Sequence, residues 1–102
     1  MNYLAKPYTS IVIRSKNEEQ QLPKLLKSIK AQYFDKSYEI ILVDSGSTDK
    51  TIEIAKKNKI RILNIPPESF SYGYALNMGV NFAQGEIIIF ISAHTTHILN
   101  FG

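Results

Sequence analysis

Asp44 closes the most informative stretch of this 102-residue chain. Four branched apolar residues, 40–43, precede it, and such a run is typical of a strand buried on both faces of a parallel sheet. The small polar residues 45–47 indicate a tight exit from that strand. Because open parallel sheets bind ligands beyond the carboxyl ends of their strands, we expect the Asp44 carboxylate to accept hydrogen bonds from a ligand, such as a base N–H or a ribose hydroxyl.

Helix capping is the competing interpretation of these polar residues. Thr48 and Asp49 lie closer to the helix that the apolar residues 52, 54 and 55 indicate, so they are better placed to cap it. We therefore favour a cap role for Asp49 and a ligand role for Asp44.

A second group of polar residues follows the first expected strand, residues 10–14. Asn17 and Gln20 have the spacing of a capping box, and Glu18 suits the positive end of a helix dipole. Alternatively, Asn17 and Glu18 join Asp44 around a ligand. We favour the cap role for Asn17.

Ser92-Ala93-His94 forms a third group, at the end of the most hydrophobic expected strand. The imidazole of His94 could bind a metal ion or donate to a phosphate, with His97 nearby. An ordinary hydrogen-bonding histidine is an equally good explanation.

Several other classes of site are excluded by missing motifs. The chain has neither G-x-G-x-x-G after its first strand nor G-x-x-x-x-G-K-[ST], and it has no G-x-S-x-G elbow for a serine nucleophile. It also has no cysteine, which excludes disulfides and thiol chemistry.

The elements that must position these groups alternate between strand and helix. Apolar spacing predicts helices that end near residues 32 and 58, and a third over residues 75–83 with Gly85 as its C-cap. The strands are expected at residues 10–14, 38–43, 60–65 and 86–91, the third of them partly exposed. This order predicts the α/β class: a Rossmann-like parallel sheet of about four strands with helices on both faces.

Length and charge fit a single domain spanning residues 1–102. The net charge of +3 comes from lysines and arginines spread along the chain, which indicates solvated helix faces rather than a nucleic-acid surface. No apolar run approaches the roughly 18 residues of a membrane span, and the start has no signal-peptide core, so we expect a cytoplasmic protein.

Three stretches resemble the nucleotide-sugar half of family 2 glycosyltransferases. They are residues 10–19 (SIVIRSKNEE), residues 41–51 (ILVDSGSTDKT), and residues 75–79 (ALNMG) through 85–91 (GEIIIFI). The resemblance implies a GT-A-type fold in which a nucleoside diphosphate sugar binds across the strand ends. It places Ser15 and Glu18 near the base, Asp44 with Ser45 at the base or ribose, and Asn77 on the sugar-diphosphate side.

The resemblance also implies a divalent cation, because residues 92–94 occupy the place of the family's acidic D-x-D motif. This chain has Ser92 and His94 where the motif has carboxylates. Imidazole tolerates Mn²⁺ better than Mg²⁺, so His94 is a candidate ligand for manganese or for the diphosphate itself. Together with residues 14–18 (RSKNE) and residues 70–73 (FSYG), residues 92–94 (SAH) resemble a rhamnosyltransferase-like bacterial subgroup.

The sequence therefore predicts the donor-binding part of an inverting glycosyltransferase. Members of the family need a further stretch, at least as long again, for the acceptor pocket and the catalytic base. No residue here can be assigned as that base, so we expect either a fragment or a truncated gene product. The rival hypothesis is a non-catalytic Rossmann-like module that self-associates, or binds a partner, through an exposed sheet edge.

Overall fold

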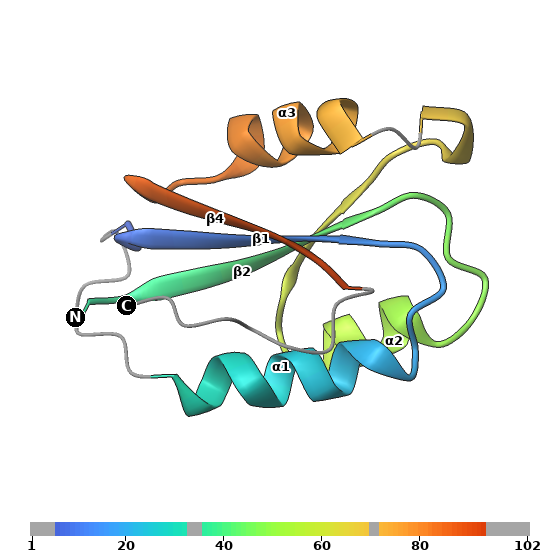
Figure 1. Ribbon diagram of the computed structural model, residues 1–102, viewed down its shortest axis with the longest axis horizontal. Helices are drawn as coiled ribbons and strands as arrows, with labels where there is room; N and C mark the ends of the chain where they lie inside the picture. The colour runs from blue at the N-terminus through green and yellow to red at the C-terminus, as the bar shows by residue number, and fades with distance from the viewer. Residues whose placement is uncertain (1–5, 33–35, 70–71, 94–102) are drawn as a thin grey trace.

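The computed structural model describes residues 6–32, 36–69 and 72–93, and it has the predicted α/β architecture (Figure 1). Strand and helix alternate along the chain, as their order in the sequence predicts. The elements are β1 (Thr9–Ser15), α1 (Gln21–Ala31), β2 (Tyr38–Asp44), α2 (Thr51–Lys57), β3 (Arg61–Asn64), the short 3-10 helix η1 (Pro67–Ser69), α3 (Tyr72–Phe82) and β4 (Ile87–Ser92).

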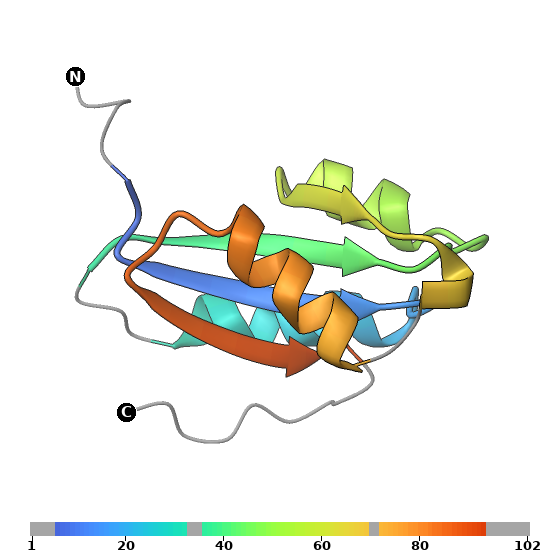
Figure 2. The ribbon, with the colours of Figure 1, turned by 90° about the horizontal axis from the view of Figure 1, so that it is seen from above.

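The four strands form one parallel sheet in the order β3-β2-β1-β4, with β3 and β4 at its two edges (Figure 2). The order reverses beside β1, because β2 lies on one side of it and β4 on the other. The register sets Ser15 opposite Asp44, and Arg14 opposite Ser92. The ends of β1, β2 and β4 therefore meet at one edge, as predicted for a ligand-binding switch point.

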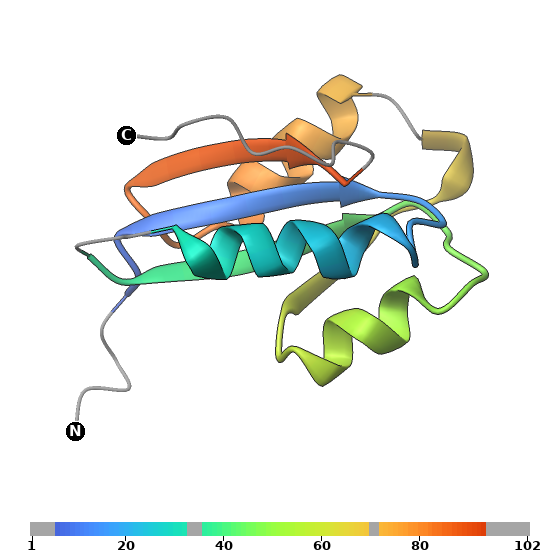
Figure 3. The ribbon, with the colours of Figure 1, turned by 60° about the horizontal axis from the view of Figure 1, so that its bottom comes forward.

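Helices cover both faces of the sheet (Figure 1, Figure 3). Ile11, Ile13 and Leu42 pack in one cluster with the apolar residues of α1 and α2, whereas Val12 and Val43 pack in another beneath α3. Neighbouring residues of a strand point to opposite faces, so a continuous apolar run fills both layers. The prediction of burial on both faces is confirmed for residues 41–43 of β2, which have no exposed surface, whereas Ile40 is partly exposed.

α3 lies unusually close to the sheet. A Cβ atom at Gly79 would overlap a methyl group of Val12 and approach Val43 to 3.4 Å. The glycine inside the predicted apolar stripe is therefore required by packing against the central strands.

Two predicted helix ends are wrong. Asn17 and Gln20 do not form a capping box, because α1 begins at Gln21 and its N-cap, Gln20, makes no side-chain hydrogen bond to it. Gly85 is not the C-cap of α3, which ends at Phe82, and the Gly85 N–H instead donates to Ser10 Oγ over 2.8 Å. In both cases a tertiary contact uses the residue that local spacing assigns to a helix end.

Asp49 forms a hydrogen bond with the start of α2, although it lies one residue before the N-cap. Its carboxylate accepts from the N–H of Thr51 over 2.9 Å, while Lys50 occupies the N-cap and makes no such bond. Asp49 therefore bonds to the first turn of α2, as its predicted cap role requires, but it is not the N-cap residue. The N–H of Thr48 instead donates to Asn17 Oδ1.

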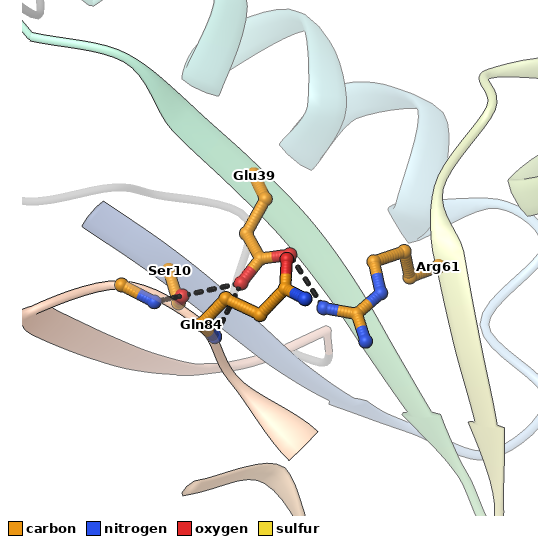
Figure 4. Close-up of polar contacts among 5 residues, drawn as sticks. Ser10, Glu39, Arg61 and Gln84 are labelled. Atoms are coloured by element: carbon orange, nitrogen blue, oxygen red, sulfur yellow. Dashed lines mark hydrogen bonds and ion pairs between the residues drawn. The ribbon is translucent and has the colours of Figure 1, made fainter. Parts of the chain in front are cut away.

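Glu39 ties the amino ends of the strands together (Figure 4). Its Oε2 atom accepts from Ser10 Oγ over 2.6 Å and from the Gln84 N–H over 2.8 Å. Its Oε1 atom pairs with Arg61 over 2.6 Å, and the Arg61 guanidinium lies 4.1 Å from the centre of the Phe82 ring. One carboxylate therefore links β1, β2, β3 and the connection into β4; we call this set of contacts the Glu39 clasp.

The clasp sets the ionisation of Glu39. Burial raises the pKa of this carboxyl group, but the hydrogen bonds from Ser10, Gln84 and Arg61, with the Arg61 charge, outweigh it and leave the pKa below its ordinary value of 4.5. A depressed folded-state pKa stabilises the protein above the unfolded-state pKa, and that contribution is lost as the pH falls through the folded-state pKa.

No helix in the described ranges, 6–32, 36–69 and 72–93, combines the length and apolar character needed to cross a membrane.

Glu39→Gln is expected to lower the free energy of unfolding at pH 7 by about 1–3 kcal/mol, because it removes a charged acceptor from three donors. Urea unfolding followed by circular dichroism measures the change. Between pH 6 and pH 3 the wild-type protein should lose more stability than the variant, with the difference developing below pH 4.5. Parallel pH profiles of the two proteins would contradict this role for Glu39.

Candidate functional site

Two loops meet at the carboxyl edge of the sheet: the β1–α1 loop, residues 16–20, and the β2–α2 loop, residues 45–50 (Figure 3). Backbone N–H groups of each loop donate to side chains of the other. Glu19 donates to Asp49 Oδ2 over 3.1 Å, and Lys50 donates to Glu19 Oε1 over 3.0 Å. The Glu18 N–H donates to Thr51 Oγ1, at the start of α2, over 2.8 Å. The loops are thus interlocked rather than independent turns.

Asp44 fixes the conformation of the β2–α2 loop by accepting hydrogen bonds from Gly46 and Ser47. Its side chain is 1% exposed, and four donors reach its two oxygens. Oδ1 accepts from Ser15 Oγ over 2.8 Å and from the Ser47 hydroxyl over 2.5 Å. Oδ2 accepts from the N–H groups of Gly46 at 3.1 Å and Ser47 at 2.8 Å. A buried carboxylate needs such compensation, so Asp44 dictates the bend of the loop.

Ser15 and Ser45 complete the buried layer beneath the loops. Ser45 donates through its N–H to the Ser15 carbonyl over 3.0 Å, extending the β1–β2 pairing by one residue. Both serines are buried, at 2% and 0% exposure. The structure brings together the predicted residues Ser15, Asp44 and Ser45.

Glu18 lies above this layer, in an open cleft of about 390 Å³. The cleft is lined by Asn17, Glu18, Glu19, Gln20, Gln21 and Asp49. Partial burial raises the pKa of Asp49, but hydrogen bonds from Thr51 and from the Glu19 N–H outweigh this and leave the pKa below its ordinary value of 3.8. A cleft lined by carboxylates and amides accepts hydrogen bonds and repels phosphate.

The remaining predicted residues lie elsewhere. Asn77 is exposed on α3, on the opposite face of the sheet from the helices that follow the two interlocked loops. Ser92 ends β4 beside Arg14, and Ala93 is buried, with its N–H donating to the Arg14 carbonyl over 2.8 Å. His94 lies outside the described residues, and within residues 6–32, 36–69 and 72–93 no group of three His, Cys, Asp or Glu could hold a metal ion.

Sequence reasoning missed the part that Ser47 plays. Its hydroxyl accepts from the Asn17 N–H over 2.8 Å and donates to Asp44, so it joins the two loops. The signal was present, because an Asp followed by small residues favours a turn in which the carboxylate binds backbone N–H groups two or three residues ahead.

Gly46 gives the β2–α2 loop its shape. Its φ is 95°, a conformation that other L residues rarely adopt, and a Cβ atom there would lie 2.6 Å from Pro67 Cγ. η1 therefore packs directly against the bend that Asp44 holds.

The family model described as glycosyl transferase family 2 matches residues 10–100. The chain belongs to glycosyl transferase family 2. Its relatives include 4,4'-diaponeurosporenoate glycosyltransferase of Staphylococcus haemolyticus, 34% identical over 82% of this chain, and Glycosyltransferase AglE of Haloferax volcanii, 34% identical over 83%. The chain spans only 23% and 30% of the length of these two relatives.

Solved structures show the same GT-A fold. TarS of S. aureus in complex with UDP-GlcNAc has a TM-score of 0.76 at 28% identity, over 87% of this chain and 26% of that one. Glucosyl-3-phosphoglycerate synthase of Mycobacterium tuberculosis, in complex with Mn²⁺, UDP and glucosyl-3-phosphoglycerate, has a TM-score of 0.69 at 28% identity, over 85% and 33%. The resemblance of the sequence to family 2 is confirmed.

Gly46→Ala is expected to lower the free energy of unfolding by about 1–3 kcal/mol, because it combines an unfavourable φ with a clash against Pro67. Pro67→Ala in the same background should recover part of the loss, since it removes the clash and leaves the φ. Thermal unfolding of the single and double variants measures both effects. Equal stability of Gly46→Ala and wild type would contradict the described bend.

Proposed function

We propose that this family 2 chain binds the nucleoside diphosphate part of a sugar donor at the carboxyl edge of β1, β2 and β4, as the donor-binding part of an inverting glycosyltransferase. The observation that carries the proposal is the pair of interlocked loops at the switch point of the sheet, where such folds bind their ligands. TarS, which shares the fold, binds UDP-GlcNAc, and this supports the same class of donor here.

Charge separates the two ends of the proposed donor. The acceptor-lined cleft over Glu18 and Asp49 suits the N–H groups of a base and the hydroxyls of a ribose. The diphosphate is repelled from that cleft and belongs nearer Arg14 and Ser92, which are neighbours in the β1–β4 register. Asn77 and His94 are proposed to contact the sugar-diphosphate side, as the family resemblance implies.

The proposal includes a divalent cation at the diphosphate, with His94 as its main protein ligand. When bound, such an ion neutralises charge on the diphosphate as it leaves. Of residues 92–94, the described Ser92 supplies only a hydroxyl, so His94 would have to supply the main ligand, and an imidazole fits Mn²⁺ better than Mg²⁺. Mn²⁺ accompanies UDP in the M. tuberculosis synthase.

Calorimetric titration of the folded chain with UDP, dTDP and GDP, each with and without Mn²⁺, tests the proposal. We expect at least one nucleotide to bind, with Mn²⁺ strengthening the interaction because it screens the diphosphate. UDP-GlcNAc and dTDP-rhamnose extend the series to whole donors, the latter because of the proposed rhamnosyltransferase-like subgroup. A folded sample that binds none of them would refute the proposal.

Asp44→Ala is expected to abolish nucleotide binding while the far-UV spectrum keeps its helix and strand content, because the sheet and helices persist but the loop loses four hydrogen bonds. Glu86→Ala is the matched control: it removes the same charge from an exposed residue at the opposite edge of the sheet. Unchanged affinity in Asp44→Ala would place the nucleotide elsewhere.

A second function, self-association, is favoured by the edge strand β4. Residues 87–91 are all apolar and Ile87 is 45% exposed, whereas the other edge strand, β3, has only four residues and includes Arg61 and Asn64. Exposed edge strands without charge or proline pair readily with other chains. Light scattering should then show a dimer that Ile87→Lys converts to a monomer; a monomeric wild-type protein would contradict this alternative.

A further inference from the structure

Asn17 has a left-handed backbone, with φ at 53°. Among the described residues only Lys59 is another non-glycine with positive φ, and Lys59 follows the C-cap of α2, where this conformation commonly ends a helix. Asn17 ends no helix. It lies in the middle of the β1–α1 loop, so another interaction must hold its backbone in this conformation.

Asn17 bonds to the neighbouring loop through two different groups. Its side-chain oxygen accepts from the N–H groups of Thr48 at 2.7 Å and Asp49 at 3.3 Å. Its own N–H donates to Ser47 Oγ over 2.8 Å. The left-handed backbone allows both groups to face the β2–α2 loop at the same time.

The contact with Ser47 continues to the buried carboxylate. Ser47 Oγ accepts from Asn17 and donates its proton to Asp44 Oδ1, which also accepts from Ser15 Oγ. An exposed residue on one loop is thereby connected, through one hydroxyl, to the charged group on which the other loop depends. If Asn17 turned away, Ser47 would lose its donor and become free to rotate from Asp44.

We propose that Asn17 is a positioning residue for nucleotide binding: it fixes Ser47, and through Ser47 the orientation of Asp44 and the shape of the acceptor-lined cleft. The inference rests on the proposed function, because it concerns the same edge of the sheet. Asn17 is exposed and belongs to neither core cluster. Its replacement therefore affects the loops far more than the packing of the sheet.

Three substitutions separate the side-chain acceptor of Asn17 from its left-handed backbone, and all three keep the backbone N–H that donates to Ser47. Asn17→Asp keeps an acceptor and tolerates the left-handed backbone. Asn17→Gly loses the acceptor but tolerates this backbone, and Asn17→Ala loses the acceptor and disfavours the backbone. With UDP as the probe, or whichever of dTDP and GDP binds better, we expect Asn17→Gly to weaken binding about tenfold, the factor that one hydrogen bond of ordinary strength represents. Asn17→Ala should bind more weakly still, and Asn17→Asp should retain most of the affinity at 0.15 M salt.

Glu39→Gln is the control for stability. It weakens the fold at the amino edge without touching either loop, so its nucleotide affinity should equal that of wild type at a temperature where both are folded. Hydrogen exchange gives a second readout: in Asn17→Gly the amide of Thr48 should lose protection while those of the central strand β1 keep theirs.

The inference is overturned if Asn17→Gly binds as well as wild type, or if Glu39→Gln loses affinity to the same extent, since affinity would then follow stability alone. It is also overturned if Thr48 stays protected in Asn17→Gly. A wild-type protein that binds no nucleotide is a different result, because it refutes the proposed function before any variant is compared.

Discussion

The structure depends on a carboxylate that has almost no contact with solvent. Asp44 is 1% exposed, so the burial of its carboxylate is tolerable only if hydrogen-bond donors surround it. The register of β1 against β2 supplies the first donor by setting Ser15 opposite Asp44, and the bend at Gly46 turns two backbone N–H groups toward the same carboxylate. The shape of the site thus follows from the need to provide hydrogen-bond donors for one buried carboxylate.

Strand β2 carries two carboxylates with different surroundings. Glu39 and Asp44 are an odd number of residues apart, so they point to opposite faces of the sheet. Glu39 lies on the face of α3 and bonds to Ser10 of β1, Arg61 of β3 and the connection into β4. Asp44 lies on the face of α1 and α2 and organises the loops that lead into them. The amino edge is held by contacts across the whole sheet, and the carboxyl edge by contacts between two loops.

The architecture could be predicted from the sequence because its signals are local and repeated. The apolar run before Asp44 and the stripe of α1 define elements that the structure confirms to within about a residue. The errors concern residues whose partners are distant in the sequence: the Asn17 side chain bonds to residues 48 and 49, and Gly85 to Ser10. The three-residue spacing of Asn17 and Gln20 suggests a capping box, but it gives no information about the N–H donors that the β2–α2 loop offers to Asn17.

The structure brings some of the predicted site residues together for the same reason. Ser15, Asp44 and Ser45 come together because two neighbouring parallel strands end together, which alternation of strand and helix already implies. The hydrogen bonds of Ser47 and Asn17 could not be predicted, because no periodic pattern in the sequence shows how the two loops meet. Asn77 lies in α3 and Ser92 in β4, so only a bound sugar donor that extends from the loops to these elements would contact them.

The position of β1 in the sheet affects how the chain folds during its synthesis. Among the strands that the structure describes, this central strand is synthesised first and its neighbour β4 last, and the contact of Ser10 with Gly85 joins residues 75 positions apart. During synthesis β1 can pair with β2 early, but its other side stays open until residues 87–92 leave the ribosome. An unpaired central edge of this kind slows folding and invites association between nascent chains.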